Sequence, residues 1–205
     1  MENRWQDLVS LIQDDQQLVE AAFDGLVARY GENGRFYHNL HHIESVLDHI
    51  QPFLAHSENR AALQFAAWFH DVIYDAPRHD NEAQSALFAQ ESLAKLGLQE
   101  TEINEVERLI MLTFGHKTAV SDKDGHILLD ADLAILASEP ATYDDYAQAI
   151  RQEYAHVPDE SYRVGRAQVL KSLGERPYLY MLPEHQSWEA KARGNIQREI
   201  AALMA

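Results

Sequence analysis

The chain contains no cysteine among its 205 residues. It can therefore form neither disulfide bonds nor thiolate nucleophiles, and sulfur-ligated zinc is excluded. The absence of cysteine favours a cytoplasmic location, because disulfides are typical of secreted proteins. No segment approaches the roughly 18 consecutive apolar residues that a membrane span needs, and the first residues are polar. We expect a cytoplasmic protein with no membrane partner.

Positive charge is also scarce. The chain has 17 lysines and arginines against 33 aspartates and glutamates, which gives a formal net charge of -16. Such a surface repels the phosphate backbone of nucleic acids, so nucleic acid is not expected as the primary partner. The 11 histidines, several of them beside acidic residues, are the compositional feature that needs an explanation.

The length and the 46% hydrophobic content suit one globular domain, which we expect to cover residues 1–205. Apolar residues, Leu11 among them, recur mostly at intervals of three and four, whereas strand-type alternation is nowhere sustained. The sequence predicts an all-α bundle of about eight helices. The polar segment 116–126 is predicted to be a surface loop. The segments with helical periodicity are 5–30, 41–54, 61–74, 80–97, 101–113, 127–137, 142–156, 161–173 and 187–204.

Acidic residues interrupt two of the most apolar segments. Asp71 follows His70 within segment 61–74, which is apolar nearly all round, as expected of a helix buried inside a bundle. Asp130 and Asp132 similarly interrupt the sequence LLDADLAIL. Because an isolated buried charge is heavily penalised, acids on two buried helices suggest a common partner.

A divalent cation would be such a partner, since imidazoles and carboxylates from several helices can converge inside a bundle. The sequence YHNLHHI supplies His38, His41 and His42 at the start of a predicted helix. Nitrogen and oxygen ligands without sulfur favour manganese, iron, magnesium, cobalt or nickel, while catalytic zinc stays open.

These residues resemble the pattern of the HD-domain superfamily of metal-dependent phosphohydrolases, which is a histidine, a later His-Asp dipeptide and a distant aspartate. Here the pattern is His42, His70, Asp71 and Asp132. The chain is most similar to a bacterial group of predicted HD phosphohydrolases, through YHNLHHI, WFHDVIYD, DNEAQSA, DADLAIL and EAKARGNIQREI, which span nearly its whole length. The resemblance implies an HD-type helical bundle in which metal-activated water cleaves a small phosphate ester. Such an enzyme would be a phosphomonoesterase or phosphodiesterase, with nucleotides among the candidate substrates.

Two of the four ligand assignments have alternatives. The family's first histidine precedes an aliphatic residue, which favours His42, followed by Ile43, over His41. The family's last aspartate commonly stands in an Ala-Asp dipeptide, which favours Asp132 over Asp130. A helix cap or a solvent-facing acid is the other interpretation of Asp130.

A hydrolase also needs groups that orient water and bind the substrate. Asp75 and Glu82, which follow the His-Asp pair, are the predicted catalytic carboxylates, although Glu82 could simply favour the dipole at a helix start. Charge builds on phosphate oxygens during cleavage and calls for positive or hydrogen-bonding partners. The predicted substrate-binding residues are His38, Arg78, His79 and His116, and further candidates are Arg35, Lys117 and Arg193.

Two other functions are compatible with the pattern. Some relatives hold two irons and oxidise organic substrates with dioxygen, and His38, His41 and His116 could supply the additional ligands. A non-catalytic module that senses or binds a ligand is the second alternative. A homodimer is compatible with each of these functions.

Overall fold

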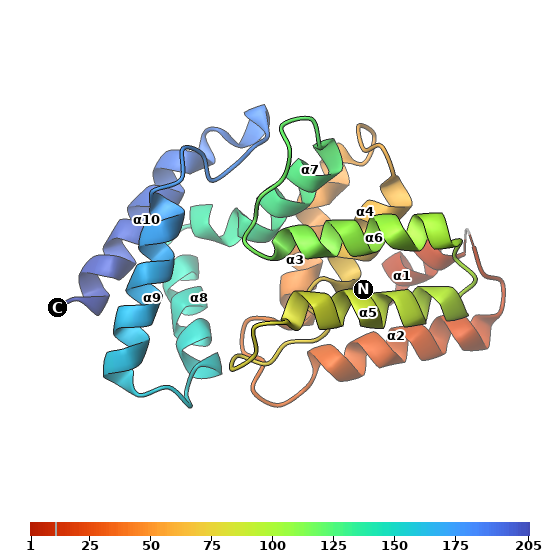
Figure 1. Ribbon diagram of the computed structural model, residues 1–205, viewed down its shortest axis with the longest axis horizontal. Coiled ribbons are helices and arrows are strands. Elements are labelled where there is room, and N and C mark those ends of the chain that lie inside the picture. Colours follow the sequence, from red (N-terminus) through yellow and green to blue (C-terminus); the bar gives the residue numbers. More distant parts are fainter. Residues whose placement is uncertain (11) are drawn as a thin grey trace. The chain divides into compact units, whose positions relative to one another are not determined.

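The computed structural model describes residues 1–10 and 12–205, and these residues form helices joined by turns and loops, with no strand (Figure 1). The all-α prediction is confirmed. The expected number of about eight helices is wrong, because the described residues form ten α-helices and three short 3-10 helices. The elements are α1 (Glu2–Val9), α2 (Gln16–Tyr30), α3 (Leu40–Ile50), η1 (Gln51–Phe53), α4 (Arg60–Phe69), α5 (Asn81–Lys95), α6 (Glu100–Thr113), α7 (Lys123–Asp132), η2 (Leu133–Ala137), α8 (Pro140–Glu153), α9 (Asp159–Gly174), η3 (Pro183–His185) and α10 (Trp188–Leu203).

Side-chain caps explain where the predicted boundaries were wrong. Segment 5–30 is two helices, because the Asp15 carboxylate accepts hydrogen bonds from the Gln17 and Leu18 amides and begins α2. Leu11 lies outside the described residues. The predicted loop 116–126 ends early, because Asp122 accepts a hydrogen bond from the Gly125 amide at 2.9 Å and caps α7.

The chain divides into two compact units, Met1–Leu129 and Asp130–Ala205, with the boundary inside α7. In the first unit, α4 packs against α3, α5 and α6. Trp5 of α1 also packs against α4, because its indole contacts the rings of Phe65 and Trp68 edge-on. Its N–H group donates to the Val19 carbonyl at 3.0 Å. The apolar sequence of α4 is thus explained by burial on all sides.

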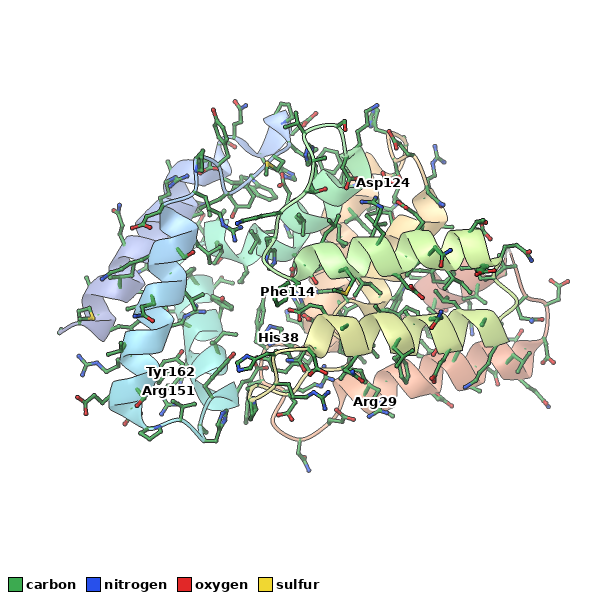
Figure 2. The ribbon with its side chains drawn as sticks, viewed as in Figure 1. Arg29, His38, Phe114, Asp124, Arg151 and Tyr162 are labelled. Carbon is green, nitrogen blue, oxygen red and sulfur yellow. The ribbon has the colours of Figure 1, made fainter. Side chains whose placement is uncertain are left out.

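The beginning of α4 is tied to the beginning of α7. The buried Asp124 carboxylate, labelled in Figure 2, accepts hydrogen bonds from the Glu58 and Asn59 amides at 3.0 and 2.8 Å. Asn59 then caps the helix by accepting from the Ala62 amide. These bonds fix the start of the helix that has His70 at its C-terminal end.

The second unit has its own core. α10 packs against α8, α9 and η2, and Arg151 lies over the ring of Tyr162 at 4.6 Å (Figure 2). A buried ion pair joins Arg166 of α9 to Glu199 of α10. The buried core residues are Leu133, Leu136, Tyr143, Leu170, Leu179, Tyr180, Ala192 and Ile196.

None of the helices in the described part of the chain combines the length and apolar character required to cross a membrane.

Replacing either of two glycines with alanine should change the free energy of unfolding, in opposite directions. A Cβ at Gly125 would lie 2.5 Å from the Asp122 carboxylate oxygen and 2.9 Å from the Leu112 side chain, whereas a Cβ at Gly165 meets nothing within 4 Å. Gly125→Ala is expected to lower the free energy of unfolding by about 1–3 kcal/mol through overpacking. Gly165→Ala, inside α9, is expected to raise it by about 0.5–1 kcal/mol through helix propensity. Urea unfolding measures both, and a stabilising Gly125→Ala would contradict the close approach of Asp122.

Candidate metal centre

Three side chains of the first unit face one another. The Nε2 atoms of His42 and His70 are 3.2 Å apart. The Asp71 Oδ2 atom lies 3.2 Å from the His70 Nε2 atom and 3.5 Å from the His42 Nε2 atom. Both histidines are buried, while the Asp71 side chain remains partly accessible. The cluster is therefore enclosed by protein and accessible through its carboxylate.

The start of α3 explains the orientation of His42. Asn39 caps this helix, and its side chain accepts a hydrogen bond from the His41 amide at 2.9 Å. The apolar residues Ile43, Val46 and Ile50 are buried on α3 together with His42. The adjacent His41 has a side chain that is 92% exposed. The helix thus directs one histidine inward and its neighbour into solvent.

The hydrogen bonding of His70 is suited to metal ligation. Its Nδ1 atom lies 3.1 Å from the Ala67 carbonyl oxygen, which can only accept a hydrogen bond, so Nδ1 carries the proton. In the neutral form of this ring, the lone pair of Nε2 faces the His42 Nε2 atom and the Asp71 carboxylate. A cation at the centre would bring these lone pairs and the negative charge into favourable contact. The donor set therefore fits a divalent ion.

The electrostatics of Asp71 favour its ionised form. Burial by itself would raise the pKa of Asp71. In the metal-free site, the charge of His70 and His38 in their protonated forms, and the hydrogen bonds that protonated His42 and His70 rings donate, hold this pKa well below the usual range. The carboxylate is therefore a charged oxygen donor at neutral pH.

Asp132, the last residue of α7, completes a group of four. His42, His70, Asp71 and Asp132 each offer one ligand atom, and these atoms all lie within 4.8 Å of one another. The group could hold a metal ion. The four residues of the sequence pattern are thus brought together in the structure.

Asp130, the alternative to Asp132 as a ligand, has hydrogen-bonding partners within the protein. It is fully buried, and its carboxylate accepts hydrogen bonds from the amides of Met181 and Leu182 at 2.7 and 2.9 Å. The Nδ1 atom of His185 lies 3.0 Å from the same carboxylate. Burial raises the pKa of Asp130 in spite of these hydrogen bonds. The interpretation of Asp130 as solvent-facing is wrong, because this residue anchors the chain segment 181–185.

His185 was missed by sequence reasoning. It is buried, and its ring stacks on Trp188 at 3.8 Å with an interplanar angle of 9°. Its partner Asp130 lies 55 positions earlier in the chain, a separation that no local sequence pattern connects.

The two predicted catalytic carboxylates lie outside the group of four. Asp75 is exposed, and its backbone amide and carbonyl bind the Asn81 side chain at 3.0 Å each, which fixes the loop before α5. Glu82 is half-buried in the first turn of α5, where an acid also favours the helix dipole. Their catalytic roles stay predictions.

Of the predicted substrate-binding residues, His38 lies beside the candidate ligands. Its ring stacks on Tyr74 at 3.9 Å and lies 6.0 Å from the ring of His42 (Figure 2). Tyr37, which sequence reasoning passed over although it directly precedes His38, lies 4.8 Å from the ring of His42. Aromatic rings therefore border the cluster.

The other three substrate-binding candidates are on surface loops. Arg78 is exposed and donates to both carboxylate oxygens of Asp80 at 2.8 and 2.7 Å. His79 is exposed, and His116 is half-buried with a φ of 50°. Arg78 thus already has an anionic partner in the neighbouring Asp80.

No protein-family model, no curated protein and no solved structure matches this chain. Its function is therefore inferred from the side chains of the site.

Proposed function

We propose that this chain is a cytoplasmic metal-dependent phosphohydrolase of the HD type that cleaves a small phosphate ester, with nucleotides among the candidates. The observation that carries the proposal is the group of His42, His70, Asp71 and Asp132, whose ligand atoms lie within 4.8 Å of one another. Two imidazoles and two carboxylates without sulfur suit manganese, iron, cobalt, nickel or magnesium, and they are also compatible with catalytic zinc. A bound divalent ion would supply an activated water and a Lewis acid for phosphoryl oxygens.

The protein's own side chains would bind the substrate and handle protons. His38, whose ring stacks on Tyr74, is proposed to donate a hydrogen bond to a phosphate oxygen. The rings of Tyr37 and Tyr74, which border the cluster, are proposed to contact a planar group of the substrate such as a nucleobase. Asp75 and Glu82 are proposed to orient the attacking water. Arg78, His79 and His116 are proposed to contact the substrate from the surrounding loops.

The dioxygen-dependent alternative has less support. It needs histidines beyond His42 and His70, and the side chain of His41 is 92% exposed and directed toward Glu44. Within the described residues, the His and Asp side chains that could hold an ion form one group of four. This set is sufficient for a hydrolase with a single ion.

Elemental analysis combined with a substrate screen tests the proposal. The purified chain is stripped with EDTA and reloaded with one metal at a time, and phosphate release is measured from nucleotides and other phosphate esters. We expect one divalent metal ion per chain and an activity that EDTA removes and a single metal restores. Two irons per chain with consumption of dioxygen would instead support the oxygenase. Bound metal without hydrolysis of any ester would support the non-catalytic module.

A further inference from the structure

Arg35 has a buried side chain whose shortest hydrogen bonds go to backbone carbonyls, and its Nη2 atom also pairs with the Glu32 carboxylate at 3.5 Å. Its side chain is 2% exposed. The Nη1 atom donates to the carbonyl of Asp71 at 2.6 Å and to that of His38 at 3.1 Å, while Nη2 donates to the carbonyl of Val72 at 2.7 Å. The sequence suggested Arg35 as a further phosphate-binding candidate, but these bonds direct its guanidinium toward the protein backbone.

These carbonyls belong to the two segments that supply candidate ligands in the first unit. His38 lies just before α3, which carries His42, and Asp71 is itself a candidate ligand. α4 ends at Phe69, and the carbonyls beyond a helix end need donors from elsewhere. The planar fork of an arginine can serve several carbonyls at fixed angles, which the single ammonium group of lysine cannot do.

Aromatic rings hold the guanidinium in place. Its central carbon lies 5.3 Å from the ring centre of Tyr30 and 5.9 Å from that of Tyr74. Tyr30 is anchored by its own hydroxyl, which donates to the Trp68 carbonyl at 2.8 Å. Tyr74 in turn stacks on His38. Arg35 is therefore restrained by two aromatic rings as well as by its hydrogen bonds to the backbone.

We propose that Arg35 is a positioning residue that fixes the spacing between His42 and the His70-Asp71 corner, and thereby sets the affinity and geometry of metal binding. The inference rests on the proposed metal site. Loss of the fork would free the Asp71 carbonyl and allow the two ligand segments to move apart. Changes to groups that orient metal ligands typically weaken binding about 10–100-fold.

Cobalt titration of the metal-free chain tests this role, because the visible spectrum of Co²⁺ reports its coordination geometry. Arg35→Met removes the donors while keeping an unbranched apolar side chain, and Arg35→Lys keeps the charge without the fork. Arg193→Met is a matched control in the second unit. The sequence suggested Arg193 as a substrate-binding candidate, but its guanidinium donates to the Glu189 carboxylate and to the carbonyls of Gly174, Arg176 and Pro177, which directs it toward the protein. All titrations are done at a temperature at which circular dichroism shows a folded chain.

We expect Arg35→Met to bind Co²⁺ about 10–100-fold more weakly with an altered spectrum, and Arg35→Lys to recover this loss only in part. Arg193→Met should lose stability but keep the affinity and spectrum of the parent chain. If the parent binds Co²⁺ and Arg35→Met or Arg35→Lys binds it identically, the positioning role is overturned while the metal site stands. If Arg35→Met does not fold, the Co²⁺ affinity and spectrum of Arg35→Lys, compared with those of the parent chain, decide whether Arg35 has the positioning role. A parent chain that binds no metal would overturn the proposed function and this inference together.

Discussion

Replacing His42 with alanine is expected to remove nearly all bound metal and to lower phosphate-ester hydrolysis by at least about 100-fold. The His42 Nε2 atom lies 3.2 Å from that of His70 and 3.5 Å from the Asp71 carboxylate, so the substitution removes one of the four proposed ligands. Changes to residues that only support a ligand already cost about 10–100-fold, and removal of a ligand should cost more. Elemental analysis and phosphate release measure the two effects.

His41→Ala is the matched control for this experiment. It makes the same change one position earlier on α3, at a side chain that is 92% exposed. Metal content and activity should stay at the level of the unsubstituted chain. Equal losses in the two variants would indicate damage to α3 rather than loss of a ligand, and full metal content in His42→Ala would refute the assignment.

The largest expected effect on stability is in the second unit, at Glu199. Its carboxylate accepts hydrogen bonds from the Arg166 Nε and Nη2 atoms at 2.8 and 3.2 Å, and the side chains of both residues are at least nine-tenths buried. Glu199→Gln would leave the buried guanidinium without a counter-charge. Because an uncompensated buried charge is costly, we expect a loss of about 3–5 kcal/mol in the free energy of unfolding, measured with urea.

Tyr143 contributes to the stability lost in Glu199→Gln, because it also binds the Glu199 carboxylate. Its hydroxyl donates to Glu199 at 2.6 Å, and burial together with the neighbouring Glu199 raises the pKa of Tyr143 well above the usual range, so the hydroxyl keeps its proton. Glu139→Gln is the matched control, because the ion pair between Glu139 and Lys191 is largely exposed. This control should change stability by less than about 1 kcal/mol. Similar losses in the two variants would contradict the importance of burial.

The acidic candidates could be predicted because their positions in the sequence are physically unfavourable without a partner, whereas the set of four came from the resemblance to the HD-domain pattern. Asp71 comes two residues after the apolar helix α4, and Asp132 ends α7 next to the aliphatic residues of η2. Burial of such charges calls for a cation or a hydrogen-bonding partner. The same reasoning could not tell which buried acid faces a cation and which is satisfied by hydrogen bonds. Asp132 lies with the other candidate ligands, whereas Asp130 is satisfied by amides and a histidine more than 50 residues away.

Other features depend on contacts that sequence periodicity does not encode. Arg35 lies in a turn region outside any helix, and its carbonyl partners at Asp71 and Val72 are 36 and 37 residues away. The division of segment 5–30 depends on one cap at Asp15. The pairing of Arg78 with Asp80, by contrast, is local, and the short sequence RHD already contained both charges.

The distribution of tryptophans gives the chain separate optical reporters. Trp5 and Trp68 pack edge-on, 5.6 Å apart, in the unit that ends at Leu129. Trp188 belongs to the other unit and lies against the imidazole of His185. Trp188→Phe therefore leaves fluorescence from the first unit alone, while a chain that retains only Trp188 reports on the second. Their denaturation curves, compared with each other, would reveal whether the two units lose their structure in one cooperative transition.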